Sequence, residues 1–457
     1  MTTASVARKS REIRCKNSVV DARQVLRELF ARDRFDEPSI FRVAFRDLNG
    51  AVGRRDFATH WIHRYPAKMF HRIPRAILQS LPCGKNIRLL DPFCGSGTVL
   101  LEGMLLGHKA IGIDVNPLAR LISLVKTTPI DPGHLQRHYS GIIRRARQAS
   151  RVFSADPELD YWFRRPVRDS LRRILYSIQQ IQDPECCDFF TVCLSACVRP
   201  CSWADPSIAP PVRLNKTRVE HANARYLRDF KRASSISGEE VFYTFEKVVN
   251  ANLRRMRELF EDEGLGNTCI QPARFEASNT GVSDNAIDAV VTSPPYCGAQ
   301  KYARSLRLEM LILGFTNEEI ADVDRRTLGT ERVRKADVEQ EVVHQCPLVG
   351  RLVRKIRKRN PVRAHMLSRY VSYLESFASE VARVLKPGSN AFVTFGTDHL
   401  AGIRIDSGDL FARAASRYSL VHVATMIDTI PSRGMITVRH STARTIPDER
   451  VIWVRKG

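Results

Sequence analysis

The segment at residues 91–98, Asp-Pro-Phe-Cys-Gly-Ser-Gly-Thr, constrains the fold more than any other part of this chain. The apolar run before it predicts a buried strand, and the helical spacing of apolar residues after it predicts a helix. Gly95 and Gly97 permit a tight turn in which backbone N–H groups approach a ligand closely. A second apolar run ends in Asp114, at the strand tip where such folds bind ribose hydroxyls. The sequence therefore predicts an α/β unit with a parallel sheet and a ligand site at its strand ends.

A second motif lies far downstream, where an apolar strand at 288–292 runs directly into Ser293, Pro294, Pro295 and Tyr296. Two successive prolines cannot continue a strand ladder, because neither has an N–H to donate. They stiffen a loop at the carboxyl end of the strand, where open α/β sheets bind ligands. The Ser293 hydroxyl and the Pro294 carbonyl could accept hydrogen bonds from an exocyclic amine, and Tyr296 offers a face for stacking a planar base.

These two motifs, together with Asp-Val-Asn-Pro at 114–117, resemble those of the amino-methylating DNA methyltransferases. The resemblance covers roughly residues 60–130 and 270–457, and it begins with His-Arg-Tyr-Pro-Ala-Lys at 63–68. It implies S-adenosylmethionine (SAM) as cofactor and a Rossmann-like SAM-dependent methyltransferase sheet with helices on both faces and a helical insert. Glu276 stands where this family usually has an aspartate near the adenine amine. The residues implied to contact the cofactor are Lys68, Asp91, Pro92, Phe93, Gly95, Ser96, Gly97, Thr98, Asp114, Asn116 and Glu276.

The resemblance also implies the reaction, in which a flipped base receives the methyl group on its exocyclic nitrogen by direct displacement. The expected catalytic residues are Ser293, Pro294, Pro295 and Tyr296. Neither Cys94 nor Cys297 lies in the Pro-Cys motif that carbon-5 methylation of cytosine requires. Serine before Pro-Pro-Tyr favours N4 of cytosine, and N6 of adenine stays open. An exocyclic amine of RNA also stays open as the target. The intact motifs argue against a decayed, non-enzymatic DNA-binding protein.

The charge of the chain favours double-stranded DNA as partner, because 72 Lys and Arg against 49 Asp and Glu give a formal net charge of +23. A basic run without acidic residues predicts contact with the DNA backbone. An arginine face at residues 164, 165, 168, 172 and 173 is a rival site for phosphates. Which region recognises the target therefore stays open. The residues of the basic run expected to bind DNA are Arg351, Arg354, Lys355, Arg357, Lys358 and Arg359.

The pattern of apolar residues divides the chain into regions. We expect an N-terminal arm at 1–58 and the SAM-binding part of a methyltransferase domain at 59–130. A helical insert, with possible target recognition, follows at 131–265. The catalytic part of the methyltransferase domain occupies 266–457 and includes a basic loop at 321–365.

Five cysteines lie close together in the expected insert, at positions 186, 187, 193, 197 and 201. The last three repeat every four residues, which places them on one face of a helix rather than in a zinc-knuckle spacing. Phenylalanine and valine around them favour a buried helix, so no metal is expected.

The expected location is the cytoplasm. No apolar run approaches the roughly 18 residues that span a bilayer, and the polar N-terminus lacks the apolar segment of a secretory signal. The odd number of cysteines, 11, favours reduced thiols in such a compartment. A cognate restriction or defence system is an expected partner, and no membrane is.

Overall fold

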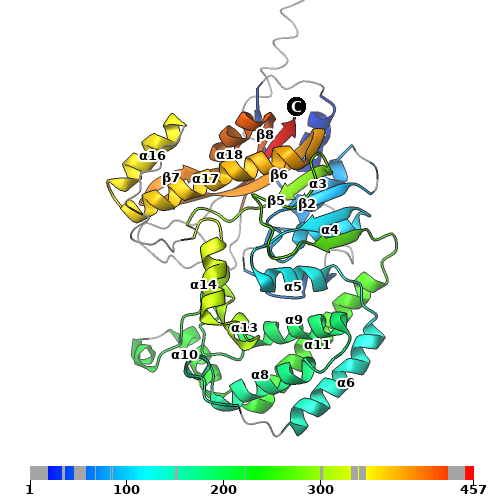
Figure 1. Cartoon of the computed structure of the whole chain (residues 1–457). Coiled ribbons are helices and arrows are strands. Elements are labelled where there is room, and N and C mark those ends of the chain that lie inside the picture. The colour runs from blue at the N-terminus through cyan, green and yellow to red at the C-terminus, as the bar shows by residue number, and fades with distance from the viewer. Residues whose placement is uncertain are drawn as a thin grey trace, which may run out of the picture.

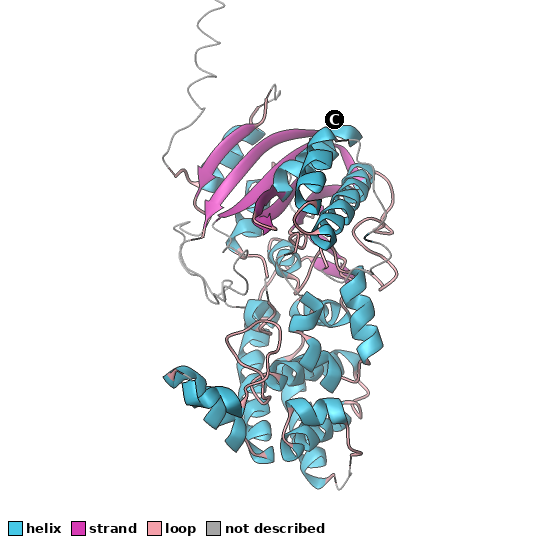
Figure 2. Ribbon diagram, turned by 90° about the vertical axis from the view of Figure 1, so that its left-hand side faces the viewer, coloured by secondary structure: helices cyan, strands magenta, loops and turns pink. Residues whose placement is uncertain are grey.

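The computed structural model describes residues 19–32, 37–45, 58–66, 68–82, 84, 86–149, 153–221, 223–298, 302–330, 338, 346–430 and 448–457. They form an upper part, in which helices cover a central sheet, and a lower part made of helices (Figures 1 and 2). No helix among these residues is long and apolar enough to cross a membrane.

The central sheet has the arrangement that the sequence predicts. In sheet order, its strands are β1 (Ser39–Val43), β8 (Leu420–Thr429), β9 (Asp448–Lys456), β6 (Leu385–Leu400), β5 (Ile287–Thr292), β2 (Arg88–Asp91), β3 (Lys109–Gly112) and β4 (Asn267–Ile270). The run from β6 to β4 is parallel, and β9 pairs antiparallel with both β6 and β8. A short strand, β7 (Ile403–Asp406), pairs antiparallel with the end of β6.

Helices cover both faces of the sheet, because the central strands β5 and β6 are nearly continuous runs of buried residues. One face packs on α2 (Ala22–Phe30), α3 (Arg72–Ser80) and α4 (Thr98–Leu105), where the Phe30 and Trp453 rings lie 4.5 Å apart. The other face packs on α17 (Pro361–Val384) and α18 (Ser407–Ala415), where the Phe377 and Phe411 rings lie 5.5 Å apart. The Rossmann-like, three-layer fold is thus established.

The lower part of the molecule confirms the helical character of the insert. Asp131, Asp156 and Asp183 each cap a helix whose first residue is proline, a combination that favours helix initiation. Cys186, Cys193, Cys197 and Cys201 are buried in its core, and Cys187 is partly buried. The helices of the insert are α6 (Pro132–Gln148), α7 (Pro157–Trp162), α8 (Arg165–Ile178), α9 (Pro184–Val198), α10 (Ala224–Ser235) and α11 (Gly238–Phe260).

The insert is joined to the sheet domain by packing as well as by chain connections. Helix α5 (Pro117–Lys126) follows β3 and packs against α9. The buried Asn252 side chain of α11 donates to the Ile62 carbonyl at 3.0 Å, next to the short helix η2 (Thr59–Trp61). Three short helices after β5 complete the same core: α12 (Tyr302–Ser305), α13 (Arg307–Ile312) and α14 (Asn317–Arg326).

Two sequence predictions differ from the structure. The described residues within 1–58 are not a separate arm, because β1 pairs with β8 and α2 buries Val25, Leu26 and Leu29 in the sheet core. The described parts of 321–365 are helical rather than a loop, with α16 (Pro347–Arg357) burying Val349, Val353 and Ile356. That apolar spacing lies within a strongly basic run, so charge masked the helical pattern.

Candidate active site

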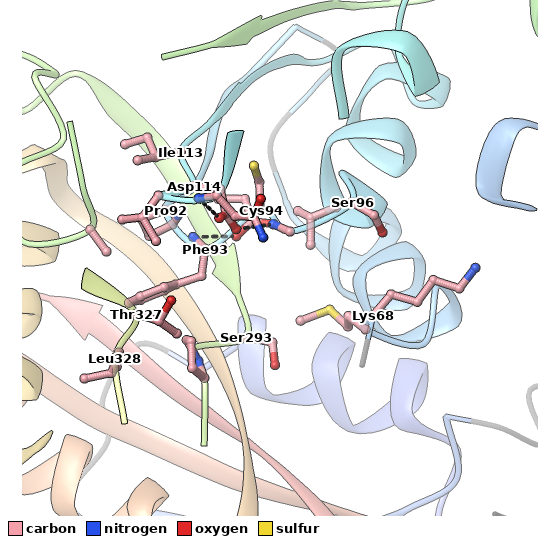
Figure 3. Close-up of a pocket in the computed structure, with 18 of the residues that line it drawn as sticks. Lys68, Pro92, Phe93, Cys94, Ser96, Ile113, Asp114, Ser293, Thr327 and Leu328 are labelled. Atoms are coloured by element: carbon pink, nitrogen blue, oxygen red, sulfur yellow. Dashed lines mark hydrogen bonds between the residues drawn. The ribbon is translucent and has the colours of Figure 1, made fainter. Parts of the chain in front are cut away.

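One cavity lies where β2, β3 and β5 end, and it brings together the two motifs that the sequence singled out (Figure 3). Its volume is about 260 Å³, several times the roughly 30 Å³ of one water molecule. The residues lining it are Tyr65, Lys68, Met69, Asp91, Pro92, Phe93, Cys94, Gly95, Ser96, Thr98, Val99, Ile113, Asp114, Val115, Asn116, Glu276, Ala277, Ser293, Pro295, Tyr296, Arg326, Thr327, Leu328, Tyr373, Ile430 and Glu449.

Almost all of the expected cofactor and catalytic residues line this cavity; Gly97 and Pro294 do not. Gly97 instead shapes the turn beneath it, with φ of +73° at the N-cap of α4. A Cβ at this position would lie 2.9 Å from the Ser123 hydroxyl, so only glycine fits. Gly95 also has positive φ, +51°, and its N–H donates to the Asp114 carboxylate at 3.0 Å.

Asp91 and Asp114 form the acidic side of the cavity. Asp91 accepts hydrogen bonds from the Phe93 N–H at 3.2 Å and the Thr292 hydroxyl at 2.6 Å, which ties the first motif to β5. Asp114 accepts from the N–H groups of Gly95 and Asn116, at 3.0 and 2.7 Å. Burial raises the pKa of Asp91 to about 7 and that of Asp114 to about 6, and the Asp114 charge further raises the pKa of Asp91.

The Ser-Pro-Pro-Tyr loop is held from three neighbouring elements. The Ser293 hydroxyl donates to the Thr394 carbonyl of β6 at 3.3 Å, and the Tyr370 hydroxyl of α17 donates to the Pro295 carbonyl at 3.2 Å. The Tyr296 hydroxyl donates to the Glu449 carboxylate of β9 at 3.4 Å. Because these bonds fix the backbone and the tyrosine ring, the loop presents its polar atoms in one arrangement.

Lys68 and Glu276 both line the cavity. The Lys68 ammonium points away from Asp114 and Ser293, as Figure 3 shows, and donates to the His60 carbonyl at 3.0 Å. It also lies 3.9 Å from the centre of the Trp61 ring. Burial, and then the Arg255 charge, lower its pKa to about 8. The Glu276 carboxylate accepts from the Ser278 hydroxyl at 2.8 Å.

The two cysteines near the motifs are poor nucleophiles. Cys94 and Cys297 are both buried. Burial raises the pKa of each thiol well above its usual value, with the charges of Asp114 and Asp91 adding to the effect on Cys94. A neighbouring Asp398 charge does the same for Cys297. Since the thiolate is the reactive form, neither side chain is prepared for covalent attack.

The sequence did not predict the cavity-lining residues that come from distant segments of the chain. Arg326 is the last residue of α14, Thr327 and Leu328 follow it, and Tyr373 comes from α17. Only the tertiary structure brings them to the strand ends, so no local sequence motif predicts their position in the cavity. Tyr65 is different, because it lies inside the segment 63–68 that carries the family resemblance.

The residues expected to bind DNA lie outside the cavity, on and just after α16. All are exposed except Arg357, which is partly buried. Helix α16 packs on α17, which reaches the active loop through Tyr370, so the basic surface is one helix away from the cavity. Arg359 is partly engaged in the fold, since it donates to the Ala401 carbonyl at 2.8 Å.

The rival arginine face is not as the sequence predicts. Arg168 is buried and forms ion pairs with Asp160 and Asp169, so it is not available to a phosphate. Arg164 and Arg165 are exposed, while Arg172 and Arg173 are partly buried.

Comparison with known proteins agrees with this site. Residues 60–130 match the family described as UPF0020: RMKL-like, methyltransferase domain. The match spans the glycine turn and Asp114. This segment is therefore similar to a methyltransferase domain.

Other relatives of this chain match much more of its length. It is 26% identical over 400 residues to the Type II methyltransferase M.MvaI of Kocuria varians, covering 82% of this chain and 85% of that one. It is 24% identical over 370 residues to the Type II methyltransferase M.AvaI of Anabaena variabilis, covering 70% of each chain. Among solved structures, the rRNA methyltransferase aviRa of Streptomyces viridochromogenes shares 13% identity, covers 90% of this chain and 96% of that one, and has a TM-score of 0.31, too low to carry an inference.

Proposed function

We propose that this chain is a site-specific DNA methyltransferase that transfers a methyl group from SAM to the exocyclic amine of a flipped base, N4 of cytosine. The observation that carries the proposal is the convergence of the glycine turn and the Ser-Pro-Pro-Tyr loop on one cavity. The Type II methyltransferases to which the chain is similar over most of its length support DNA as substrate and a restriction–modification context.

The cavity residues fit the cofactor. Gly97 keeps the turn at the N-terminus of α4 compact, where a side chain would meet Ser123. Asp114 would accept hydrogen bonds from the ribose hydroxyls, since each carboxylate oxygen that binds a backbone N–H keeps a second lone pair. Pro92, Phe93 and Ile113, which line the cavity, would provide apolar surface for the adenine ring.

SAM supplies an electrophilic methyl group when it is bound. Ser293, which lines the cavity, would accept a hydrogen bond from the target amine and direct its lone pair toward that methyl group. The Pro294 carbonyl, next in the loop but outside the lining of the cavity, is the second acceptor that we propose. Tyr296 would stack on the flipped base, with its ring held by Glu449. Alignment then contributes much of the catalysis, and the raised pKa values of Cys94 and Cys297 agree with direct displacement.

The DNA backbone would be contacted by the basic surface of α16, with Arg351 exposed in the middle of the helix and Arg354 and Lys355 exposed on its last turn. Such contacts are electrostatic and position the duplex without reading its sequence. We propose the helical insert as the region that reads the target.

The test is to incubate the purified full chain with labelled SAM and mixed duplex DNA, digest the DNA, and identify the modified nucleoside by mass spectrometry. We expect N4-methylcytosine, absent with Tyr296→Ala. N6-methyladenine would retain the mechanism and overturn the choice of base. Label in RNA but not in DNA would overturn the proposed substrate, and no label in either would contradict the proposed reaction.

A further inference from the structure

A second cluster of chemically reactive side chains lies in the helical insert, apart from the cavity. It consists of His134 and His138 on α6 and of Asp183 and Cys186 at the start of α9. One potential metal-binding atom from each residue lies within 4.8 Å of those of the other three. None of these residues lines the active-site cavity, so the proposed methyl transfer does not account for their proximity.

Local structure explains how α6 and the start of α9 each supply two of the four side chains. His134 and His138 are four residues apart and therefore project from the same face of α6; their ring centres lie 4.7 Å apart. Asp183 is the N-cap of α9, and its Oδ1 accepts from the Cys186 N–H at 3.1 Å. That capping bond places the Asp183 carboxylate beside the Cys186 side chain, and it does not use the second carboxylate oxygen, Oδ2.

The two pairs face each other across the contact between α6 and α9. Asp183 Oδ2 lies 2.8 Å from His134 Nε2. Tyr139, which follows His138 on α6, stacks on Phe190, one turn after Cys186 on α9, with ring centres 6.5 Å apart. Helices α6 and α9 both pack on α8 and α11, and this shared packing holds all four side chains together.

The surroundings of the cluster suit a bound cation. Cys186 is fully buried, whereas the other three residues are partly exposed, so an ion could reach the site from solvent and lose part of its hydration there. Glu185 adds a nearby negative charge. Arg137 approaches His134 Nδ1 at 3.2 Å and would have to turn outward, because a His bound to metal through Nε2 carries its proton on Nδ1.

We propose that His134, His138, Asp183 and Cys186 bind one zinc ion in a tetrahedral site that fastens α6 to α9. Two imidazoles, a carboxylate and a thiolate are all zinc ligands, whereas magnesium and calcium prefer oxygen ligands alone. Four protein ligands leave no open position, so the ion is structural rather than catalytic. On binding, the Cys186 thiol releases its proton to solvent, and the ion replaces the hydrogen bond between His134 and Asp183.

The experiment uses the full chain, purified without chelator after expression with added zinc, and measures bound metal by elemental mass spectrometry. We expect one zinc per chain, and a lower melting temperature after the zinc is removed. His138→Asn and Cys186→Ser should each lose the ion. Cys187→Ser, changed in the same first turn of α9 but outside the cluster, should keep it. Zinc retained by both cluster variants, or absent from the unaltered chain, would overturn the proposal.

Cobalt(II) gives a second measurement that does not depend on how well a variant folds. The zinc-free chain titrated with cobalt should develop the visible bands of a tetrahedral ion and a thiolate-to-cobalt charge-transfer band. Visible bands without the charge-transfer band would exclude Cys186 as a ligand, and weak octahedral bands would exclude the closed four-ligand site.

Discussion

The active-site cavity and the basic helix α16 both carry residues with a proposed role, yet they are built differently. In the cavity, Asp91 and Tyr296 are buried, and each is held by hydrogen bonds to another element. On α16 the basic side chains are mostly exposed, and only the apolar side of the helix is packed. A buried group held by hydrogen bonds contributes individually to binding or catalysis, whereas exposed charges contribute to DNA binding as a sum. We therefore expect large effects from single changes in the cavity and small, additive ones on α16.

The largest effect is expected for Tyr296→Ala. Loss of base stacking costs about 1–3 kcal/mol, and with the added loss of alignment the methylation rate should fall about 100-fold or more. Initial rates with labelled SAM measure this. Tyr296→Phe, which keeps the ring, should retain most of the activity, and so should Cys297→Ser. Strong inhibition by the cysteine change would contradict direct displacement.

The next largest effect is expected for Asp114→Asn. Hydrogen bonds to a charged group contribute about 1.5–3 kcal/mol, so SAM affinity should weaken roughly 10- to 100-fold. Calorimetric titration of SAM gives the affinity. Asp288→Asn, on the same sheet but outside the cavity, serves as the matched control and should bind SAM normally. Unchanged affinity in Asp114→Asn would remove this residue from the proposed cofactor site.

A smaller effect should follow when Arg351, Arg354 and Lys355 are together changed to Gln. DNA affinity should fall several-fold on all sequences alike, and the dependence of log affinity on log salt should weaken by about 0.9 per lost phosphate contact. The matched triple is Arg225, Arg228 and Lys231, exposed on α10 of the insert. If that triple weakens the salt dependence and the α16 triple does not, the backbone contact belongs to the insert.

The smallest effect concerns stability and pH. Burial raises the pKa of Asp91 to about 7, above the value of about 3.9 for an exposed aspartate. The folded chain therefore binds more protons than the unfolded chain between these values, so its stability falls as pH rises from about 4 to about 7. Between these pH values, the melting temperature of Asp91→Asn should fall by a few degrees less than that of the unaltered chain. An equal pH dependence in both proteins would show that Asp91 titrates normally.

Motif chemistry made much of the site predictable, and packing made the rest unpredictable. The glycine turn and the Ser-Pro-Pro-Tyr loop could be assigned to strand ends because turn geometry and the missing N–H of proline are local properties. The same local reasoning did not reveal α16, whose apolar side is interrupted by arginine and lysine, or β1, which is a strand only because β8 lies beside it.

The sequence by itself determined the parallel sheet, the cofactor turn and the residue types that can hold an exocyclic amine, since these depend on neighbours along the chain. The tertiary structure decided which side chains meet. It buried Arg168, brought Thr327, Tyr373 and Glu449 to the cavity, and set two histidines of α6 against the start of α9. Such contacts depend on how helices pack on each other and on the sheet, and that packing is settled by the whole core at once.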